Sequence, residues 1–153
     1  MISLVRTNSG SPDFVSLVIL LDAELRIRDG EDHAFYAQFN KIDSLQQVVV
    51  AYSDGIAVGC GAIKPFADRT AEVKRMFVRP ENRGKRVAGE ILRELEAWAK
   101  ELNFDECVLE TGHKQPEAIA LYKRSGYEVI PNYGQYIGMD NSVCMKKTIR
   151  TLN

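Results

Sequence analysis

Cysteine is scarce in this sequence, and its three cysteines do not form a disulfide or metal-binding pattern. They stand at Cys60, Cys107 and Cys144, far apart, and each falls within an apolar run of the kind that forms a buried strand. An odd number of widely spaced thiols is typical of core packing rather than of a zinc site or a disulfide framework. The sequence therefore predicts three buried thiols and no metal.

Long apolar runs and an excess of one charge are missing as well. No run approaches the roughly 18 apolar residues that cross a membrane. The first residues, MISLVRTNSGSPDF, lack the basic and apolar segments of a secretory signal. The 20 basic residues nearly balance the 21 acidic ones, for a net charge of −1. We therefore expect a cytoplasmic protein whose partners include neither nucleic acid nor a membrane.

What the sequence does contain is the pattern of one α/β domain over residues 1–153. Its length and its 45% of hydrophobic residues suffice for a substantial core. Apolar residues recur at strand or helix spacing in the order β-α-α-β-β-β-α-β-α-β-β. We expect strands at 2–6, 47–52, 55–63, 71–78, 105–110, 127–130 and 143–149, helices at 14–29, 32–39, 87–102 and 116–125, a turn at 64–69 and a long loop at 131–141.

The most informative stretch runs from residue 71 to residue 102. Its strand ends at Arg79-Pro80, where the proline favours extended geometry in the residue before it. A polar loop follows, and then a helix with an apolar face. Amides in the first turn of a helix lack partners and carry partial positive charge, and Arg83, Lys85 and Arg86 add three full charges there. The pattern predicts a phosphate or pyrophosphate site, although neither the Walker nor the dinucleotide glycine motif is present.

Two segments resemble the GNAT family of N-acetyltransferases. Residues 83–88, RGKRVA, are similar to the family's acyl-CoA loop, R/Q-x-x-G-x-G/A, and follow a strand as that loop does. The departure is Arg86, where the family has a glycine, so that a side chain either crowds the pyrophosphate or contacts it. Residues 115–127 resemble the family's second segment, with Gln115 at the usual asparagine and Tyr122 at the usual tyrosine. The resemblance covers roughly the C-terminal half of the chain.

The resemblance implies a fold, a co-substrate and a binding groove. The implied fold is α/β, with a mixed central sheet splayed at its core strand and helices on both faces. The implied co-substrate is acetyl-CoA, without a metal, and a homodimer through the C-terminal strands is expected by analogy. The residues implied to line the cofactor groove are Met76, Phe77, Val78, Arg83, Gly84, Lys85, Arg86, Val87, Ala88, Gln115, Ala118, Leu121, Tyr122 and Arg124.

Acetyl transfer to an amine requires a polarised thioester carbonyl, a base for the amine and an acid for the leaving thiolate. A backbone N–H of Met76 or Phe77 is expected to stabilise the oxyanion. By the resemblance, Tyr122 is the general acid, and the alternative is a tyrosine that packs its helix. Glu72, early on the central strand, is the candidate general base, and the alternative is a carboxylate paired with Lys74 or Arg75.

Candidates for the acceptor pocket come from the regions in which this family varies. The set comprises His33, Phe35, Tyr36, Phe39, Tyr133, Gln135, Tyr136 and Asp140, with Asp22 or Asp140 as a partner for a cationic amine. For each, ordinary packing or an exposed surface position remains an alternative. His113 is expected to be a solvated loop residue, and Trp98 to be a packing residue.

We therefore predict an acetyl-CoA-dependent N-acetyltransferase that acts on a primary amine by direct transfer. The cysteines lie in predicted strand cores away from the loop, which argues against an acyl-cysteine intermediate. A small molecule is favoured as the acceptor, with a protein or peptide amine as the alternative. Two further alternatives are a CoA-binding sensor without turnover, which Arg86 keeps open, and an interaction protein that has lost the cofactor.

Overall fold

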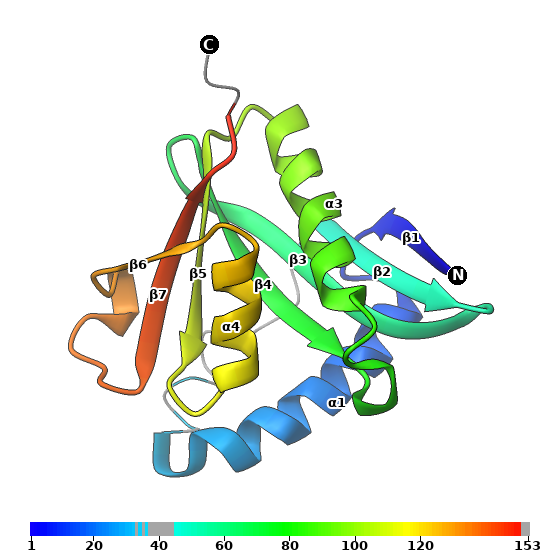
Figure 1. Cartoon of the computed structure of the whole chain (residues 1–153), viewed down its shortest axis with the longest axis horizontal. Coiled ribbons are helices and arrows are strands. Elements are labelled where there is room, and N and C mark those ends of the chain that lie inside the picture. The colour runs from blue at the N-terminus through cyan, green and yellow to red at the C-terminus, as the bar shows by residue number, and fades with distance from the viewer. Residues whose placement is uncertain (33, 35, 37–44, 151–153) are drawn as a thin grey trace.

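The computed structural model describes residues 1–32, 34, 36 and 45–150, and in this part of the chain seven strands form one sheet (Figure 1). The sheet order is β1-β2-β3-β4-β5-β7-β6. The strands are β1 (Ile2–Thr7), β2 (Gln47–Ser53), β3 (Ile56–Ala67), β4 (Thr70–Val78), β5 (Glu106–Gly112), β6 (Glu128–Ile130) and β7 (Ser142–Thr148). The helices are α1 (Pro12–Asp29), α3 (Val87–Glu101) and α4 (Pro116–Arg124), with 3-10 turns at Gly30–Asp32, Pro80–Asn82 and Gly134–Tyr136. The predicted helix at 32–39 falls largely outside the described residues.

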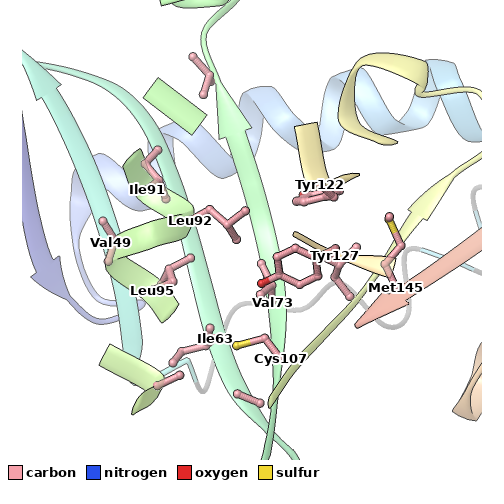
Figure 2. Close-up of a cluster of buried hydrophobic side chains, with 14 of the residues drawn as sticks. Val49, Ile63, Val73, Ile91, Leu92, Leu95, Cys107, Tyr122, Tyr127 and Met145 are labelled. Carbon is pink, nitrogen blue, oxygen red and sulfur yellow. The ribbon is translucent and has the colours of Figure 1, made fainter. Parts of the chain in front are cut away.

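Helices cover both faces of the sheet, as predicted. On one face, the apolar side of α3 packs against the sheet, together with Tyr122 of α4 and Tyr127 (Figure 2). On the other face, Phe14, Leu17 and Leu21 of α1 pack against β2 and β3. Figure 1 shows α3 and α4 in front of the sheet and α1 behind it. The mixed α/β fold predicted from the sequence is therefore confirmed.

Local sequence signals account for the helix ends. The Ser11 hydroxyl accepts a hydrogen bond from the Phe14 amide at 3.3 Å and caps α1, with Pro12 in the first turn. Pro116 likewise opens α4, as predicted. Gly126, just beyond the C-cap of α4, has a φ of +99°, which favours glycine.

The predicted turn at 64–69 is wrong, because β3 and β4 continue through it. β3 reaches Ala67, and β4 begins at Thr70, so that only Asp68 and Arg69 connect the strands. Pro65, which lacks an N–H, lies within β3 beside a register shift between residues 65 and 67. Proline is tolerated in a sheet at such irregular positions.

The sheet opens into a V between β4 and β5. These parallel strands pair only from Thr70 to Glu72 and from Glu106 to Val108. Beyond these residues β4 continues to Val78 and β5 to Gly112 without further pairing between them. The splayed core strand that the resemblance implied is therefore present, and it leaves backbone groups of β4 facing the gap.

A bulge in β4 lies beside this gap. Cys60 pairs with Phe77 and Ala62 with Lys74, so two residues of β4, Arg75 and Met76, face Gly61 alone. A Cβ atom on Gly61 would come within 2.5 Å of the Met76 sulfur and 2.9 Å of a Leu95 methyl group, so a larger residue there would force these side chains to shift.

The three thiols and Trp98 take the structural roles expected of them. Cys60, Cys107 and Cys144 are buried and free, and burial raises the pKa of Cys60 and of Cys107 to about 12. Trp98 of α3 packs at the edge of the hydrophobic core on that side of the sheet, and the Arg6 guanidinium lies 4.9 Å from its ring centroid. Among the helices that the structure describes, none is long and apolar enough to cross a membrane.

Candidate active site

A groove of about 750 Å³ lies where β4, the 79–86 loop, α3, α4 and α1 meet. The resemblance assigned fourteen residues to the cofactor groove, and the structure brings thirteen of them together in its lining. The exception is Lys85, which is exposed and does not line the groove. The thirteen come from four parts of the chain: the end of β4, the polar loop, the first turn of α3, and α4 with its N-cap Gln115.

The loop adopts the shape that the family's glycine pattern would suggest. Arg86 is the N-cap of α3 and has a φ of +66°, in the left-handed region, and Gly84 has a φ of +77°. A left-handed non-glycine residue costs roughly 1 kcal/mol, which explains why glycine suits position 86. Arg86 lines the groove without closing it, so the amides that begin α3 remain beside an open space.

Arg83 is already engaged within the protein. Its Nε donates to the Val78 carbonyl at 2.9 Å, and its Nη2 donates to Glu24 at 2.7 Å. The guanidinium carbon also lies 5.6 Å from the centre of the Phe77 ring. Arg83 therefore anchors the loop to β4 and α1, while Arg86 forms no salt bridge within the described residues.

Sequence reasoning missed the wall of the groove that α1 provides. Leu21, Glu24, Leu25 and Arg28 line it from one side of that helix. Their spacing of three and four residues marks a single helical face, and this is the signal that could have identified them. It was hidden because α1 is apolar on its outer side as well, where Ile19 and Ile27 are 64% and 82% exposed.

A second, smaller cavity of about 120 Å³ opens from the V between β4 and β5. It shares with the groove the residues Leu21, Leu25, Met76, Gln115, Ala118 and Tyr122. The two spaces therefore meet beside the β4 bulge and the Tyr122 ring. The charged residues in the lining of the smaller cavity are Asp29, Glu72, Lys74, Arg75 and Glu110.

Glu72, the predicted base, is 2% exposed and accepts a hydrogen bond from the Tyr133 hydroxyl at 2.7 Å. The Tyr133 ring is supported by an edge contact with Phe66, with 4.7 Å between the ring centres. Neither suggested pairing with Lys74 or Arg75 occurs within the described residues: Lys74 Nζ donates to the Tyr136 hydroxyl at 3.5 Å, and Arg75 pairs with Asp22. Burial lowers the pKa of Lys74.

Glu110 is the second carboxylate in this cavity, and sequence reasoning missed it. It lies near the end of β5, on the opposite arm of the V from Lys74. Burial raises its pKa to about 7, partly offset by a hydrogen bond from Ser142 and by the charge of Lys74. The available signal was a lone carboxylate closing the apolar run Cys107-Val108-Leu109. Such a group, balanced between its two protonation states near neutral pH, is suited to accept a proton.

Tyr122 lies where the two cavities meet and is 7% exposed. Its ring makes an edge contact with Tyr127, with 5.9 Å between the ring centres. Its hydroxyl has no hydrogen-bond partner among the residues that the structure describes. Burial and then the charge of Glu110 raise the pKa of Tyr122, so that the phenol keeps its proton at neutral pH.

The remaining acceptor candidates divide into three groups. Tyr36 and Tyr136 line the smaller cavity, and their stacked rings have centres 6.3 Å apart. They belong to one apolar cluster with Tyr133 and Cys144. Gln135, Asp140 and His113 line neither of the two cavities, and Asp22 binds Arg75. The candidates His33, Phe35 and Phe39 lie outside the described residues.

Comparison with known proteins gives a consistent family. A sequence model of the acetyltransferase (GNAT) family matches residues 16–127. An IAA acetyltransferase of Azospirillum brasilense is 36% identical over 102 residues, covering 66% of this chain and 67% of that protein. Some other curated relatives are matched over only about half of their length, 49% and 50% in two cases.

Solved structures agree with this result over nearly the whole chain. A presumed acyl-CoA N-acyltransferase of Klebsiella pneumoniae superposes with a TM-score of 0.82 at 29% identity, covering 97% of this chain and 98% of that one. The PaiA N-acetyltransferase of Thermoplasma acidophilum, solved with coenzyme A, has a TM-score of 0.72 at 18% identity and 97% and 99% coverage. The fold and the site thus define an acyltransferase of the GNAT type. The chain belongs to the acetyltransferase (GNAT) family and is an acetyltransferase enzyme.

Proposed function

We propose that this enzyme transfers the acetyl group of acetyl-CoA directly to a primary amine of a small molecule. The observation that carries the proposal is the meeting of two cavities at Met76 and Tyr122. One cavity is lined by the basic loop before α3, and in the other burial raises the pKa of the Glu110 carboxyl to about 7. A thioester held in the larger groove would present its carbonyl where the smaller cavity opens.

The residues present fit acetyl-CoA. The first amides of α3 and the guanidinium of Arg86 suit a pyrophosphate, because both supply hydrogen-bond donors and positive charge. The unpaired backbone of β4 beside the V suits the amide-rich pantetheine arm, which would add to the sheet edge like a short strand. Gln115, Ala118 and Leu121 of the α4 side would form the other wall of the arm's groove.

The acceptor amine would react from the smaller cavity. In the deprotonated state, Glu110 accepts the proton that the amine loses as its nitrogen attacks the thioester carbonyl. A bulge amide, at Met76 or Phe77, donates to the oxyanion that forms, and Tyr122 donates a proton to the departing thiolate. Glu72, which is held by Tyr133, then supplies negative charge that favours an amine near the opening.

Two features support direct transfer to a small acceptor. The three thiols are fully buried in the sheet, and none of them lines either cavity, so an acyl-cysteine step has no nucleophile at this site among the described residues. A cavity of about 120 Å³ takes an amine and a few carbon atoms, which suits a small acceptor.

Calorimetric titration tests the proposal before any acceptor is known. Acetyl-CoA should bind with micromolar affinity, and dephospho-CoA and ATP should bind more weakly because each lacks part of the recognised ligand. Thiol release on a panel of primary amines, amino acids and short peptides then identifies the acceptor class. Binding without thiol release on the whole panel would favour a CoA sensor, and no binding would exclude the cofactor.

The Tyr122→Phe variant should lose about 100-fold in turnover, in the range usual for a general acid, while its affinity for acetyl-CoA stays within about twofold. The matched control is Tyr127→Phe, because the Tyr127 hydroxyl donates to Glu96 at 2.9 Å in the neighbouring core. That control should lower the melting temperature and leave turnover nearly unchanged. Steady-state kinetics with calorimetry measures both quantities, and an equal loss of turnover and affinity in Tyr122→Phe would mark a packing residue.

A further inference from the structure

Arg75 combines three unfavourable features. It has a φ of +60° within a strand, a region that non-glycine residues rarely occupy. Its side chain is 1% exposed, so a full positive charge is removed from water. Its Nε atom is buried without a hydrogen-bond partner among the described residues. Backbone strain and an unpaired buried donor persist only when the surroundings hold them, and they gather at functional positions.

Two contacts hold Arg75 in this state, one from each neighbouring element. Its Nη2 donates to Asp22 of α1 at 2.5 Å, and the side chain of Asp22 is 53% exposed. Its carbonyl accepts a hydrogen bond from the Cys60 thiol of β3 at 3.4 Å. The side chain therefore ties the bulge to α1 on one face of the sheet, and the backbone ties it to β3 within the sheet.

The bulge decides which backbone groups face the V. Amides along a strand point alternately to its two neighbours, and one extra residue shifts that alternation. Arg75 and Met76 both line the smaller cavity, and Met76 also lines the groove. Any relaxation of Arg75 out of the left-handed region would rotate the adjoining peptide groups away from the meeting point of the two cavities.

We propose that the Asp22–Arg75 pair is a tie that holds the β4 bulge in the shape that presents backbone amides to the thioester, which makes both residues positioning residues for acetyl transfer. The inference rests on the proposed function for its catalytic consequence. Its structural part, the shape of the bulge, can be measured without turnover. The sequence suggested Asp22 as a partner for a cationic acceptor amine. In this proposal Asp22 instead affects acetyl transfer by holding Arg75.

The test variant is Asp22→Ala, because alanine suits a helix and Asp22 lines neither cavity. The kcat should fall about tenfold to 100-fold, as expected when an oxyanion donor is misplaced, while the KM for acetyl-CoA stays within about twofold. Hydrogen exchange of the 75–77 amides, followed by NMR, should accelerate at least about tenfold through local opening. Asp22→Glu keeps the charge and should restore most of both quantities.

The chain offers a matched control in the Arg69–Asp105 pair. There, Nε and Nη2 of Arg69 both bind Asp105, on the surface and away from the cavities. Asp105→Ala should leave kcat and the 75–77 exchange rates unchanged. If hydrogen exchange of the 75–77 amides is unchanged in Asp22→Ala, the Asp22–Arg75 pair does not hold the bulge, and this result counts even if no acceptor amine has been identified. Faster exchange with unchanged kcat would overturn the positioning role. A wild-type enzyme that acetylates no amine would overturn the proposed function and leave exchange to decide the tie.

Discussion

Replacing Glu110 with glutamine should lower kcat/KM at pH 7 by about 100-fold or more, within the range usual for loss of a general base. Glutamine has nearly the same shape as glutamate but accepts no proton at this pH. The affinity for acetyl-CoA should not change, because Glu110 lines only the smaller cavity and not the groove. Steady-state kinetics with a fixed amine, combined with calorimetry of acetyl-CoA, measures the two effects separately.

The pH dependence follows from the same carboxylate. Because burial raises the pKa of Glu110 to about 7, wild-type kcat/KM should rise with pH through that value as the base loses its proton. In Glu110→Gln, the pH profile of kcat/KM should lack this rise near pH 7. It should keep only the rise at higher pH that reports deprotonation of the acceptor amine itself. An unchanged limb near pH 7 in the variant would assign the proton acceptor elsewhere.

The free energy of unfolding should respond to pH in the opposite direction. The ordinary pKa of a glutamate is 4.5, and that of folded Glu110 is raised to about 7. Between these two pH values folded Glu110 keeps a proton that the unfolded chain has released. The stability contributed by this group is therefore present at low pH and is lost as the pH rises through about 7. Above that pH Glu110→Gln should be more stable than the wild type, and thermal unfolding at pH 5 and pH 8 tests the difference.

Glu72→Gln is the matched comparison for the base. Glu72 is the carboxylate that the family resemblance favoured, and it lies in the same cavity. Its hydrogen bond from Tyr133 occupies one oxygen, and a glutamine oxygen can accept the same bond. We expect kcat/KM to fall by less than about tenfold if Glu110 is the base. The reverse order, with Glu72→Gln the more severe variant, would return the role to the family's usual position.

The sequence predicted those parts of the site that are continuous in the chain. The end of β4, the loop and the first turn of α3 follow one another directly, so one motif located this side of the groove, and the segment at 115–127 located the α4 side. Their conformation depends on local sterics, and the same sterics explain why a glycine pattern includes position 86. Arg86 was identified as the exception, and its positive φ gives the physical reason.

The parts that the sequence did not predict depend on tertiary packing. Glu110 and Lys74 come to the same cavity only because β4 and β5 diverge, and no local pattern records where two strands separate. The pairing of Asp22 with Arg75 joins residues 53 positions apart. Periodicity indicates that α1 is a helix, but its apolar residues lie on more than one side. Which side lines the groove is therefore decided by the sheet against which it packs.

Reversing the charge of Arg86 should weaken acetyl-CoA binding by about 100-fold, because a charge-assisted hydrogen bond is worth about 1.5–3 kcal/mol and a carboxylate also repels a phosphate. Arg86 is the better target than Arg83, because Arg83 is already bound to Glu24 and to the Val78 carbonyl. Arg86→Glu keeps a side chain in the same left-handed conformation, so the backbone of the loop changes little. Calorimetric titration with acetyl-CoA measures the loss.

Lys85→Glu provides the control, because it makes the same change in net charge one residue away, at a side chain that does not line the groove. Its effect should be several-fold at most and should disappear at high salt, as long-range charge effects do. Equal weakening by both variants would reduce the site to general electrostatic attraction, and no weakening by either would remove the phosphate loop. Arg86→Gly completes the series: it relieves a backbone cost of roughly 1 kcal/mol, so it should raise the melting temperature while weakening binding less than Arg86→Glu does.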